Sequence, residues 1–270
     1  MKTVTTVDCH PSAIVHPKAR LSDGVRIGPY AVVGEYVSLG RDTIVEASSV
    51  IEGYTSIGER NRIFPFASIG LEPQDLKFNG EKSTLEIGND NKFREFVTIH
   101  RGTELGGGRT VIGNSNLFMA YTHIAHDCIV GNHIVFSNGA TLGGHVIVDD
   151  YSAVGGYSGV HQFCRLGAHS YIGGYSAITK DVLPFSLTVG NRARLYGVNV
   201  VGLQRREFSQ ERIAALKSAF RLLQQSKLNV TQAIDELENK SMNDDVRVIV
   251  DFIRSSERGV IIKRGIESID

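Results

Sequence analysis

Residues 112–178 read IGNSNLFMAYTHIAHDCIVGNHIVFSNGATLGGHVIVDDYSAVGGYSGVHQFCRLGAHSYIGGYSAI. An apolar residue recurs at every sixth position of this stretch. These positions are Ile112, Phe118, Ile124, Val130, Phe136, Leu142, Val148, Val154, Val160, Leu166, Ile172 and Ile178. A period of six matches neither the 3.6 of an α-helix nor the 2 of an alternating strand. It predicts a short strand and a bend, repeated many times.

The same period extends toward the N-terminus in two further runs, from Val15 to Ile69 and from Ile87 to Leu105. Glycine follows the apolar residue in 13 of the 26 units, and a small residue such as Ala31 often precedes it by two. Two residues that far apart face the same side of a strand. We attribute the glycine to the backbone conformation of a tight bend. Such a unit cannot bury its apolar side alone, so hexapeptide repeats predict a stacked, parallel β-helix.

Two segments interrupt the period, at residues 71–86 and 106–111. Insertions in a solenoid become loops on one face, often the binding face. The period ends after Ile178, and residues 184–206 have no regular pattern. Apolar spacing then predicts a helix behind a Ser209 N-cap and further helices near 231–240 and 245–256. We therefore expect a β-helix over residues 1–190 and an α-helical domain over 191–270.

Composition excludes several classes of protein. The chain has 270 residues, 29 of them glycine, and its formal net charge is zero. No apolar run approaches the roughly 18 residues of a membrane span, so we expect no transmembrane helix. We also expect no secretion signal, because the first ten residues do not combine a basic segment with an apolar one. Three widely spaced cysteines suit a reduced cytoplasmic protein. The neutral total argues against general nucleic-acid binding, unless the charge is segregated along the chain.

Histidines gather when the repeats are stacked. Three hexads make one triangular coil, so residues three hexads apart lie about 4.8 Å apart on successive coils. His126 then stacks on Gly144 and Gly144 on Gln162, with His145 and His161 adjoining this column. His123 lies three residues before His126.

Three interpretations of this cluster remain open. The residues could be exposed polar groups at corners, or a zinc site, since clustered histidines bind zinc. They could also hold a general base, because a neutral imidazole accepts a proton near pH 7. In that case Asp127 would orient the His126 ring, and the Gly144 amide would face a developing oxyanion.

A second column and a charged segment are also candidates for binding. Gly156 and Gly174 are one coil apart and would leave a shallow groove for an extended alkyl chain, unless they only serve the bends. Residues 192–227 carry eight basic residues against Glu207 and Glu211, a net charge of +6. Adjacent Arg205 and Arg206 suit a phosphate or pyrophosphate, and the wider basic face suits an acidic protein. The basic residues are Arg192, Arg194, Arg205, Arg206, Arg212, Lys217, Arg221 and Lys227.

Several motifs together resemble one family. They are QDLKFNGE (74–81), TIHRG (98–102), HIAHDC (123–128), GGHV (143–146), VHQFC (160–164) and GVNVVGLQRR (197–206). The chain resembles the bacterial UDP-N-acetylglucosamine O-acyltransferases from about residue 10 to its end. That resemblance implies a left-handed parallel β-helix and a homotrimer with active sites between subunits.

The resemblance also implies the chemistry. An (R)-3-hydroxyacyl group would pass from acyl carrier protein to the glucosamine 3-hydroxyl of UDP-N-acetylglucosamine, the first step of lipid A synthesis, without a metal or other cofactor. His126 would be the general base, Asp127 its partner and the Gly144 amide the oxyanion donor. Other matching positions would bind the substrates: Gln74, Asp75, Lys77, His100, His123, His145, His161, Gln162, Gly174, Asn199, Arg205 and Arg206.

The chain departs from the family pattern at Val201, where an acidic residue is expected, and at Arg192, where histidine is frequent. These departures concern the contacts with the nucleotide sugar. The nearest alternative is an acyltransferase acting on a 3-amino or other UDP-sugar, or the N-acylating enzyme of the same pathway. A metal-dependent hydratase of the γ-carbonic anhydrase type and a non-catalytic scaffold are more distant ones.

Overall fold

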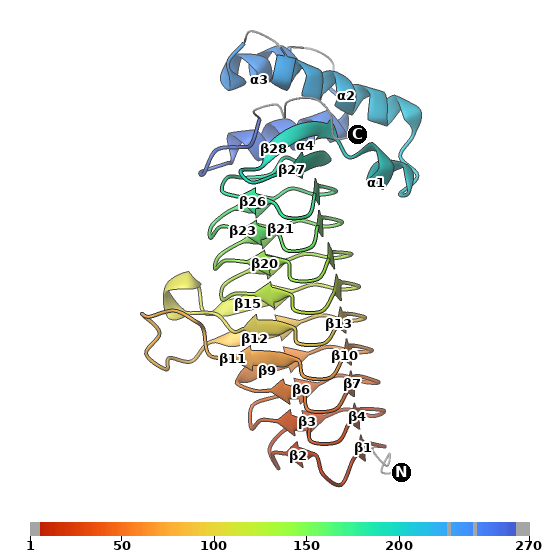
Figure 1. Cartoon of the computed structure of the whole chain (residues 1–270), viewed down its shortest axis with the longest axis vertical. Coiled ribbons are helices and arrows are strands. Elements are labelled where there is room, and N and C mark those ends of the chain that lie inside the picture. The colour runs from red at the N-terminus through yellow and green to blue at the C-terminus, as the bar shows by residue number, and fades with distance from the viewer. Residues whose placement is uncertain (1–5, 226–227, 240–241, 263–270) are drawn as a thin grey trace.

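The computed structural model describes residues 6–225, 228–239 and 242–262. The chain winds into a left-handed parallel β-helix, and its α-helices lie at one end of the column of coils (Figure 1). Each coil contributes one short strand to each of three sheets, which we call A, B and C. We name the bends after the sheets they join: the A–B, B–C and C–A corners.

The strands are mostly two residues long. Sheet A has 11 strands: β1 (Asp8–Cys9), β4 (Arg26–Ile27), β7 (Ile44–Val45), β10 (Arg62–Ile63), β13 (Lys92–Phe93), β16 (Leu117–Phe118), β19 (Val135–Phe136), β22 (Ala153–Val154), β25 (Tyr171–Ile172), β27 (Ser186–Val189) and β28 (Arg194–Val198). Sheet B has nine: β2 (Ile14–Val15), β5 (Val32–Val33), β8 (Val50–Ile51), β11 (Ser68–Leu71), β14 (Thr98–His100), β17 (His123–Ile124), β20 (Thr141–Leu142), β23 (Gly159–Val160) and β26 (Ala177–Ile178). Sheet C has eight: β3 (Arg20–Leu21), β6 (Ser38–Leu39), β9 (Tyr54–Ile57), β12 (Thr84–Ile87), β15 (Arg109–Ile112), β18 (Ile129–Val130), β21 (Ile147–Val148) and β24 (Arg165–Leu166).

The register confirms that one regular coil consists of three hexads. Val33 pairs with Ile51, and Val130 pairs with Val148, in each case in parallel and one coil on. The periodic apolar residues fill the interior, and all but three of them are buried. Val15 and Leu21, in the first coil, are half-buried, because no earlier coil covers them.

The third exception is Leu105, where the prediction of a core position is wrong. Its side chain is 81% exposed, next to Glu104 in the short 3-10 helix η1 (Glu104–Gly106). The partner of Ile99 on the next coil is Ile124, whereas a regular coil would pair Ile99 with Leu117. This coil is longer than a regular one by one hexad plus one residue. Leu105 follows Ile99 by six residues and so matches the period, although it lies on the loop that holds the extra residues.

Both long coils bulge at the same corner. Ile69 pairs with Ile99, whereas a regular coil would pair it with Ile87, and this longer coil accommodates the first insertion. Leu71 still belongs to β11 and Thr84 already belongs to β12, so the loop itself spans residues 72–83. The second loop spans residues 101–108, between β14 and β15. Each loop leaves sheet B and returns in sheet C, so both loops lie on the B–C corner.

The explanation given above for the periodic glycines is wrong. Of the glycines that follow an apolar core residue, only Gly70 has a positive φ. The left-handed conformation instead occurs two residues later, mostly at residues other than glycine, such as Asp127 (φ 60°) and His145 (φ 62°). A Cβ on Gly40 would lie 2.4 Å from the carbonyl carbon of Gly58, and one on Gly155 would lie 2.4 Å from the nitrogen of Gly174. Glycine is present because successive coils approach too closely for a side chain.

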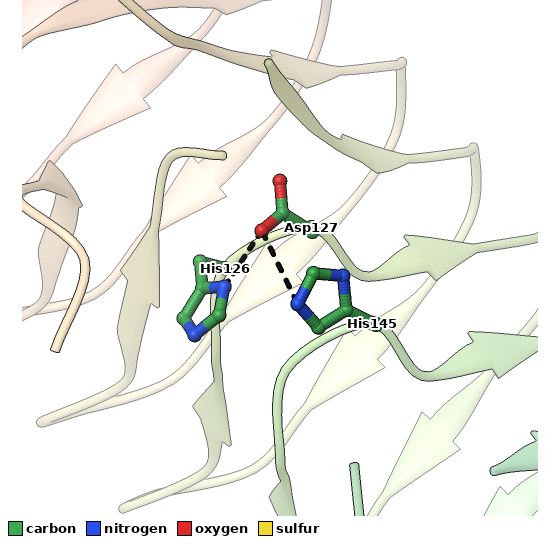
Figure 2. A group of neighbouring side chains, drawn as sticks. All are labelled: His126, Asp127 and His145. Atoms are coloured by element: carbon green, nitrogen blue, oxygen red, sulfur yellow. Dashed lines mark hydrogen bonds and ion pairs between the residues drawn. The ribbon is translucent and has the colours of Figure 1, made fainter. Parts of the chain in front are cut away.

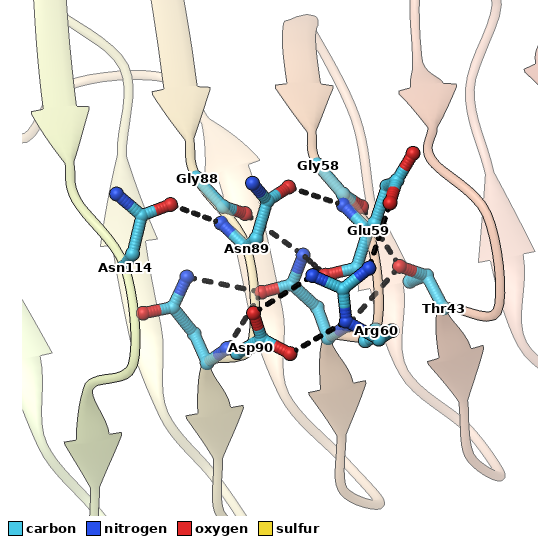
Figure 3. Close-up of polar contacts among 10 residues, drawn as sticks. Thr43, Gly58, Glu59, Arg60, Gly88, Asn89, Asp90 and Asn114 are labelled. Atoms are coloured by element: carbon cyan, nitrogen blue, oxygen red, sulfur yellow. Dashed lines mark hydrogen bonds and ion pairs between the residues drawn. The ribbon is translucent and has the colours of Figure 1, made fainter.

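Asparagine side chains connect the coils at the C–A corner (Figure 3). On the outside, Asn89 Oδ1 accepts from the Glu59 N–H at 2.7 Å, and Asn114 Oδ1 accepts from the Asn89 N–H at 2.8 Å. On the inside, Asn91 Nδ2 donates to Asn61 Oδ1 and to the Gly113 carbonyl, both at 3.0 Å. The inner ladder satisfies the polar groups of Asn61, Asn91 and Asn116, which are buried.

The C-terminal part begins with two strands that continue sheet A. Residues 184–206 were expected to be irregular, but β27 pairs in parallel with β25, and β28 folds back antiparallel to β27. This hairpin has no six-residue period, which explains why the sequence pattern missed it. The helices are α1 (Val200–Gln204), α2 (Gln210–Gln225), α3 (Val230–Glu238) and α4 (Asp244–Arg254).

Helix α2 confirms the predicted amphipathic pattern. Ile213, Leu216, Phe220 and Leu223 are buried, and Ser209 Oγ accepts from the Arg212 N–H at 3.3 Å. Two positions named in the sequence analysis lie outside the described residues: Lys227 of the basic segment and residue 240 of the helix expected near 231–240. Division of the chain into domains at residue 190 stays a prediction. In the described ranges, no helix has the length and apolar character needed to cross a membrane.

We predict that Asn91→Ala lowers the free energy of unfolding by about 2–4 kcal/mol, because it leaves buried partners on both neighbouring coils unpaired. Asn91 is fully buried, and its Oδ1 also accepts from the Asn116 N–H. Thermal unfolding followed by circular dichroism measures the effect. Asn79→Ala, in the exposed loop 72–83, is the control and should leave the midpoint unchanged. An equal midpoint for the two variants would contradict the role of the ladder.

Candidate active site

The B–C corner brings most of the predicted site residues together. Loop 72–83, loop 101–108 and the bends after β17, β20 and β23 all lie on this corner. The predicted stacking of His126 on Gly144 is confirmed, since the His126 carbonyl accepts from the His145 N–H at 3.0 Å. A Cβ on Gly144 would lie 2.6 Å from Cε1 of the His126 ring. Gly144 therefore lies directly against this ring and has no room for a side chain.

His126 and Asp127 form a hydrogen-bonded pair (Figure 2). Nδ1 of His126 lies 2.7 Å from Oδ2 of Asp127, whose side chain is completely buried. A carboxylate accepts, so Nδ1 carries a proton, and in the neutral form of the ring Nε2 has a free lone pair. The His126 side chain is 12% exposed, which leaves it open to a ligand. The pair therefore has the geometry of a general base with an orienting acid.

Loop 101–108 fixes the Asp127 carboxylate. The Thr103 N–H donates to Oδ1 and the Thr103 hydroxyl donates to Oδ2, both at 2.7 Å. Burial raises the pKa of Asp127, but the hydrogen bonds from His126 and Thr103 and the nearby His145 ring outweigh it and hold the pKa below its ordinary value. Asp127 is therefore ionised at neutral pH.

His145 completes the polar cluster from the next coil. Its Nε2 lies 3.7 Å from Asp127 Oδ2, and its ring meets the His126 ring edge-on at 5.1 Å between centroids. The Phe163 ring stacks on its other side at 4.3 Å. Burial lowers the pKa of His145, against the opposing field of Asp127. The ring is therefore mainly neutral at pH 7 and can exchange hydrogen bonds with hydroxyl groups.

His100 and His123 extend the cluster toward the preceding coil. Their rings meet edge-on at 5.0 Å, and His123 Nδ1 lies 2.7 Å from the Thr98 hydroxyl. Burial, then the neighbouring His123, His126 and Arg101, lowers the pKa of His100 to about 4. Nδ1 of His100 is buried and has no hydrogen-bond partner in the part of the chain described here. Buried polar atoms are usually paired, so this nitrogen is a candidate for contact with a bound ligand.

The Gly144 amide also has its donor capacity free. Within the described ranges, this N–H forms no hydrogen bond. The equivalent amides at the C–A corner are bonded, for example the Asn132 N–H to Asp150 Oδ1 at 2.7 Å. At the B–C corner the stacked residue is Gln162, which is exposed. The Gly144 N–H can therefore bind an oxyanion next to His126.

Loop 72–83 carries Gln74, Asp75 and Lys77, of which Asp75 lies near the cluster. Asp75 Oδ1 accepts from the Lys77 N–H at 3.0 Å, and the Asp75 carboxylate is close enough to raise the pKa of His145, although burial has the larger and opposite effect. The Arg101 guanidinium lies 5.2 Å from the centre of the Phe78 ring and holds this loop against the coil.

Gln162 stacks on Gly144 as predicted, since the Gly144 carbonyl accepts from the Phe163 N–H at 3.1 Å. Gln162 and the adjoining His161 lie on the next coil of the same corner and are exposed. Gly156 and Gly174 are stacked as predicted, since the Tyr175 N–H donates to the Gly156 carbonyl at 2.9 Å. However, they follow strands of sheet A and lie on the A–B corner, so the alkyl groove expected there is on a different edge from His126.

Asn199, Arg205 and Arg206 lie at the end of the C–A corner. Asn199 caps helix α1 through the Gly202 N–H and donates to the His169 carbonyl, so its side chain is engaged in the fold. Arg206 donates to the Tyr151 carbonyl at 3.0 Å and packs against the Tyr151 ring. Arg205 is exposed.

A zinc site was another interpretation that the sequence left open for the histidine cluster. Ligand atoms of His126, Asp127 and His145 lie within 4.8 Å of one another, a grouping that zinc can use. In the present arrangement, Oδ2 of Asp127 already accepts hydrogen bonds from both His126 and Thr103. The geometry therefore favours proton transfer over metal binding.

Sequence reasoning missed three residues that shape the site. Thr103, Arg101 and Phe163 hold Asp127, loop 72–83 and His145, respectively. The one available signal was the break in the six-residue period at residues 106–111, which located the second loop but not the direction of its side chains.

Comparison with known proteins identifies relatives over nearly the whole chain. Residues 181–261 match the family model described as UDP-N-acetylglucosamine O-acyltransferase, domain 2, and residues 109–144 match the bacterial transferase hexapeptide model. The acyl-[acyl-carrier-protein]–UDP-N-acetylglucosamine O-acyltransferase of Thermodesulfovibrio yellowstonii is 46% identical over 94% of this chain and 98% of its own. The enzyme of that name from Syntrophobacter fumaroxidans is 48% identical over 93% and 98%. The solved structure of LpxA from Acinetobacter baumannii is 42% identical, with a TM-score of 0.91 over 94% of this chain and 99% of that chain.

The buried, neutral His100 predicts a pH dependence of stability. The unfolded chain takes up a proton near pH 6.5, whereas the folded protein does so only near pH 4, so stability falls as pH decreases through this interval and is constant above it. We expect His100→Gln to reduce that loss by about 3 kcal/mol. Chemical denaturation between pH 4 and 7.5 measures it, with His16→Asn on the first coil as the control. A profile for His100→Gln parallel to that of the unmodified chain would contradict the prediction.

Proposed function

The chain belongs to the UDP-N-acetylglucosamine O-acyltransferase family, and from this premise we infer that it catalyses the reaction of that family. It transfers an (R)-3-hydroxyacyl chain from acyl carrier protein to the glucosamine 3-hydroxyl of UDP-N-acetylglucosamine, the first step of lipid A biosynthesis. The observation that carries this proposal is the His126–Asp127 pair beside the free Gly144 amide.

We propose that His126 is the general base. Its Nε2 accepts the proton of the acceptor's 3-hydroxyl as that oxygen attacks the thioester carbonyl carbon. Asp127 holds Nδ1–H and stabilises the positive charge that develops on the ring. Without the buried carboxylate of Asp127, a positive charge would be unfavourable in a cluster of otherwise neutral histidines.

The Gly144 N–H then binds the oxyanion of the tetrahedral intermediate. Removal of one such donor typically costs about 10²- to 10³-fold in rate. When the intermediate collapses, the bond from carbon to sulfur breaks, and the thiolate of the carrier's prosthetic arm takes the proton back from His126. The products are the 3-O-acyl sugar nucleotide and the free carrier thiol.

The surrounding polar residues suit recognition of the acceptor sugar. His100, His123 and His145 are neutral at pH 7 by burial, and neutral imidazoles both donate to and accept from hydroxyl groups. From loop 72–83, Gln74, Asp75 and Lys77 supply an amide, a carboxylate and an ammonium group at the open side of the cluster.

We propose a homotrimer with active sites between subunits. Predicted substrate-binding residues occupy three different corners of one prism: His161 and Gln162 the B–C corner, Gly174 the A–B corner, and Asn199 with Arg205 and Arg206 the end of the C–A corner. They can surround one substrate only if corners of neighbouring chains meet. An exposed aromatic row along the A–B corner supports such packing: Tyr30, Phe66, Phe96, Tyr121, Tyr157 and Tyr175.

Acyl carrier protein is the proposed donor, and the basic segment is its proposed docking region. Arg192, Arg194, Arg205, Lys217 and Arg221 are exposed near the C-terminal helices, where an acidic partner would gain favourable charge contacts. A cytoplasmic location fits the three free cysteines, Cys9, Cys128 and Cys164.

The acceptor and the acyl chain are tested together by product analysis. We expect UDP-N-acetylglucosamine and a mixed pool of 3-hydroxyacyl carrier proteins to give a UDP-sugar with one added ester-linked acyl group. Mass spectrometry reads the chain length, and mild alkali distinguishes an ester, which is cleaved, from an amide, which is not. Turnover only with a 3-amino UDP-sugar would favour the alternative acceptor.

We predict that His126→Ala reduces kcat by about 10²- to 10⁴-fold while coil structure and assembly are retained. The physical reason is the loss of the group that takes the hydroxyl proton. Steady-state kinetics measures the loss, and size-exclusion chromatography checks the assembly. His133→Ala is the matched control, because that ring stacks on Tyr151 at the C–A corner. Near-normal turnover of His126→Ala would disprove the assignment of the base.

A further inference from the structure

Loop 101–108 places a buried threonine against the carboxylate of the His126–Asp127 pair. We propose that Thr103 is a positioning residue for acyl transfer, which holds the Asp127 carboxylate in the one orientation that directs Oδ2 at His126 Nδ1. This inference rests on the general-base function proposed above. Thr103 does not touch the reacting atoms in this arrangement and acts through Asp127.

The contacts of Thr103 fix the carboxylate at both oxygens. Its N–H donates to Oδ1 and its hydroxyl donates to Oδ2, each at 2.7 Å. His126 Nδ1 donates to the same Oδ2, also at 2.7 Å. Two donors on one rigid residue prevent rotation about the bond that carries the carboxylate. On the main-chain side, the Asp127 N–H donates to the Thr110 hydroxyl at 2.8 Å. The carboxylate therefore has little freedom to turn away from His126.

The rest of the loop is arranged around this contact. The Thr103 hydroxyl accepts from the Gly106 N–H at 3.2 Å, which leaves its own hydrogen directed at Asp127. The Thr103 carbonyl accepts from the Gly108 N–H at 2.7 Å. A Cβ on Gly106 would lie 2.0 Å from Cγ of Asp127. Glycine at 106 is therefore required for the loop to close over the carboxylate.

A purely structural role for Thr103 is the alternative. The same hydroxyl caps η1 through Gly106, so its removal could simply loosen the loop. The two roles predict different kinetic results. A loosened loop changes stability and substrate affinity, whereas a misdirected carboxylate lowers kcat and changes the pH dependence of the pair.

The direction of the pH effect follows from the groups around Asp127. The titratable groups that face its carboxylate are His126, His145 and Cys128, and burial raises the pKa of the Cys128 thiol to about 12. Loss of the Thr103 hydroxyl removes one donor that stabilises the carboxylate. The carboxylate then becomes more basic and binds the His126 proton more tightly, so the acidic limb of the rate profile, which belongs to the pair, moves to higher pH.

The experiment compares Thr103→Val with Thr103→Ser in the full chain, with purified acyl carrier protein substrate and UDP-N-acetylglucosamine. We expect Thr103→Val to lower kcat about 10- to 100-fold with KM changed by less than about threefold, and to raise the midpoint of the acidic limb by about half to one pH unit. Thr103→Ser keeps the hydroxyl and should restore kcat to within about threefold of the unmodified enzyme. Thr43→Val, another fully buried threonine that caps a carbonyl far from the site, is the control.

A second variant keeps the test decisive if Thr103→Val does not fold. Gly106→Ala retains Thr103 but inserts a methyl group against the carboxylate, so it should show the same loss of kcat and the same pH displacement. Gly34→Ala, where a Cβ makes only ordinary contacts, is its control. Unchanged kcat in a folded Thr103→Val or Gly106→Ala variant would overturn the proposal. A loss of kcat that Thr103→Ser does not restore, with an unmoved acidic limb, would also overturn it. Inactivity of the unmodified enzyme with these substrates would instead refute the proposed function.

Discussion

The structure depends on one constraint, the fixed register between successive coils. The short strands pair with their equivalents on the neighbouring coils, and a two-residue strand has too few hydrogen bonds to persist without these neighbours. The register places each kind of residue in a vertical column. Columns of apolar residues form the interior, columns of glycine let the coils approach, and columns of polar residues form at the corners. The site is therefore a column of the solenoid, enlarged by two loops.

This register explains how much the sequence could predict. The apolar period and the length of one coil were enough to stack Gly144 on His126 and Gly174 on Gly156, because both follow from arithmetic. The same arithmetic failed at Leu105, where an insertion of one hexad plus one residue imitates the period. It could not assign Thr103 to Asp127, because that contact depends on the conformation of a loop and not on a repeat. Stacking of the repeats and the resemblance to a family both pointed to His126 and Asp127, but the orienting threonine became visible only in three dimensions.

The role of glycine shows the limit of reasoning from one residue type. Glycine suggested a bend with positive φ, yet that conformation occurs at positions such as Asp127 and His145. A non-glycine residue in the left-handed region is tolerated only when its surroundings fix it. At the B–C corner, hydrogen bonds from Thr103 fix Asp127, and stacking on Phe163 fixes His145. The left-handed backbone conformation thus directs the Asp127 and His145 side chains toward each other.

The two polar corners show how one repeat supports both stability and catalysis. The amide two residues after the buried apolar residue points along the solenoid axis. At the C–A corner, asparagine side chains accept from these amides, for example Asn114 from Asn89, and connect the coils. At the B–C corner the corresponding residues are His126, Gly144 and Gln162, and the Gly144 amide has no acceptor among the described residues. A donor left unpaired within the fold is available to the reaction, and it lies against the imidazole that would accept the proton. Of these two polar corners, catalysis would therefore occupy the one at which the described residues leave these amides without an acceptor.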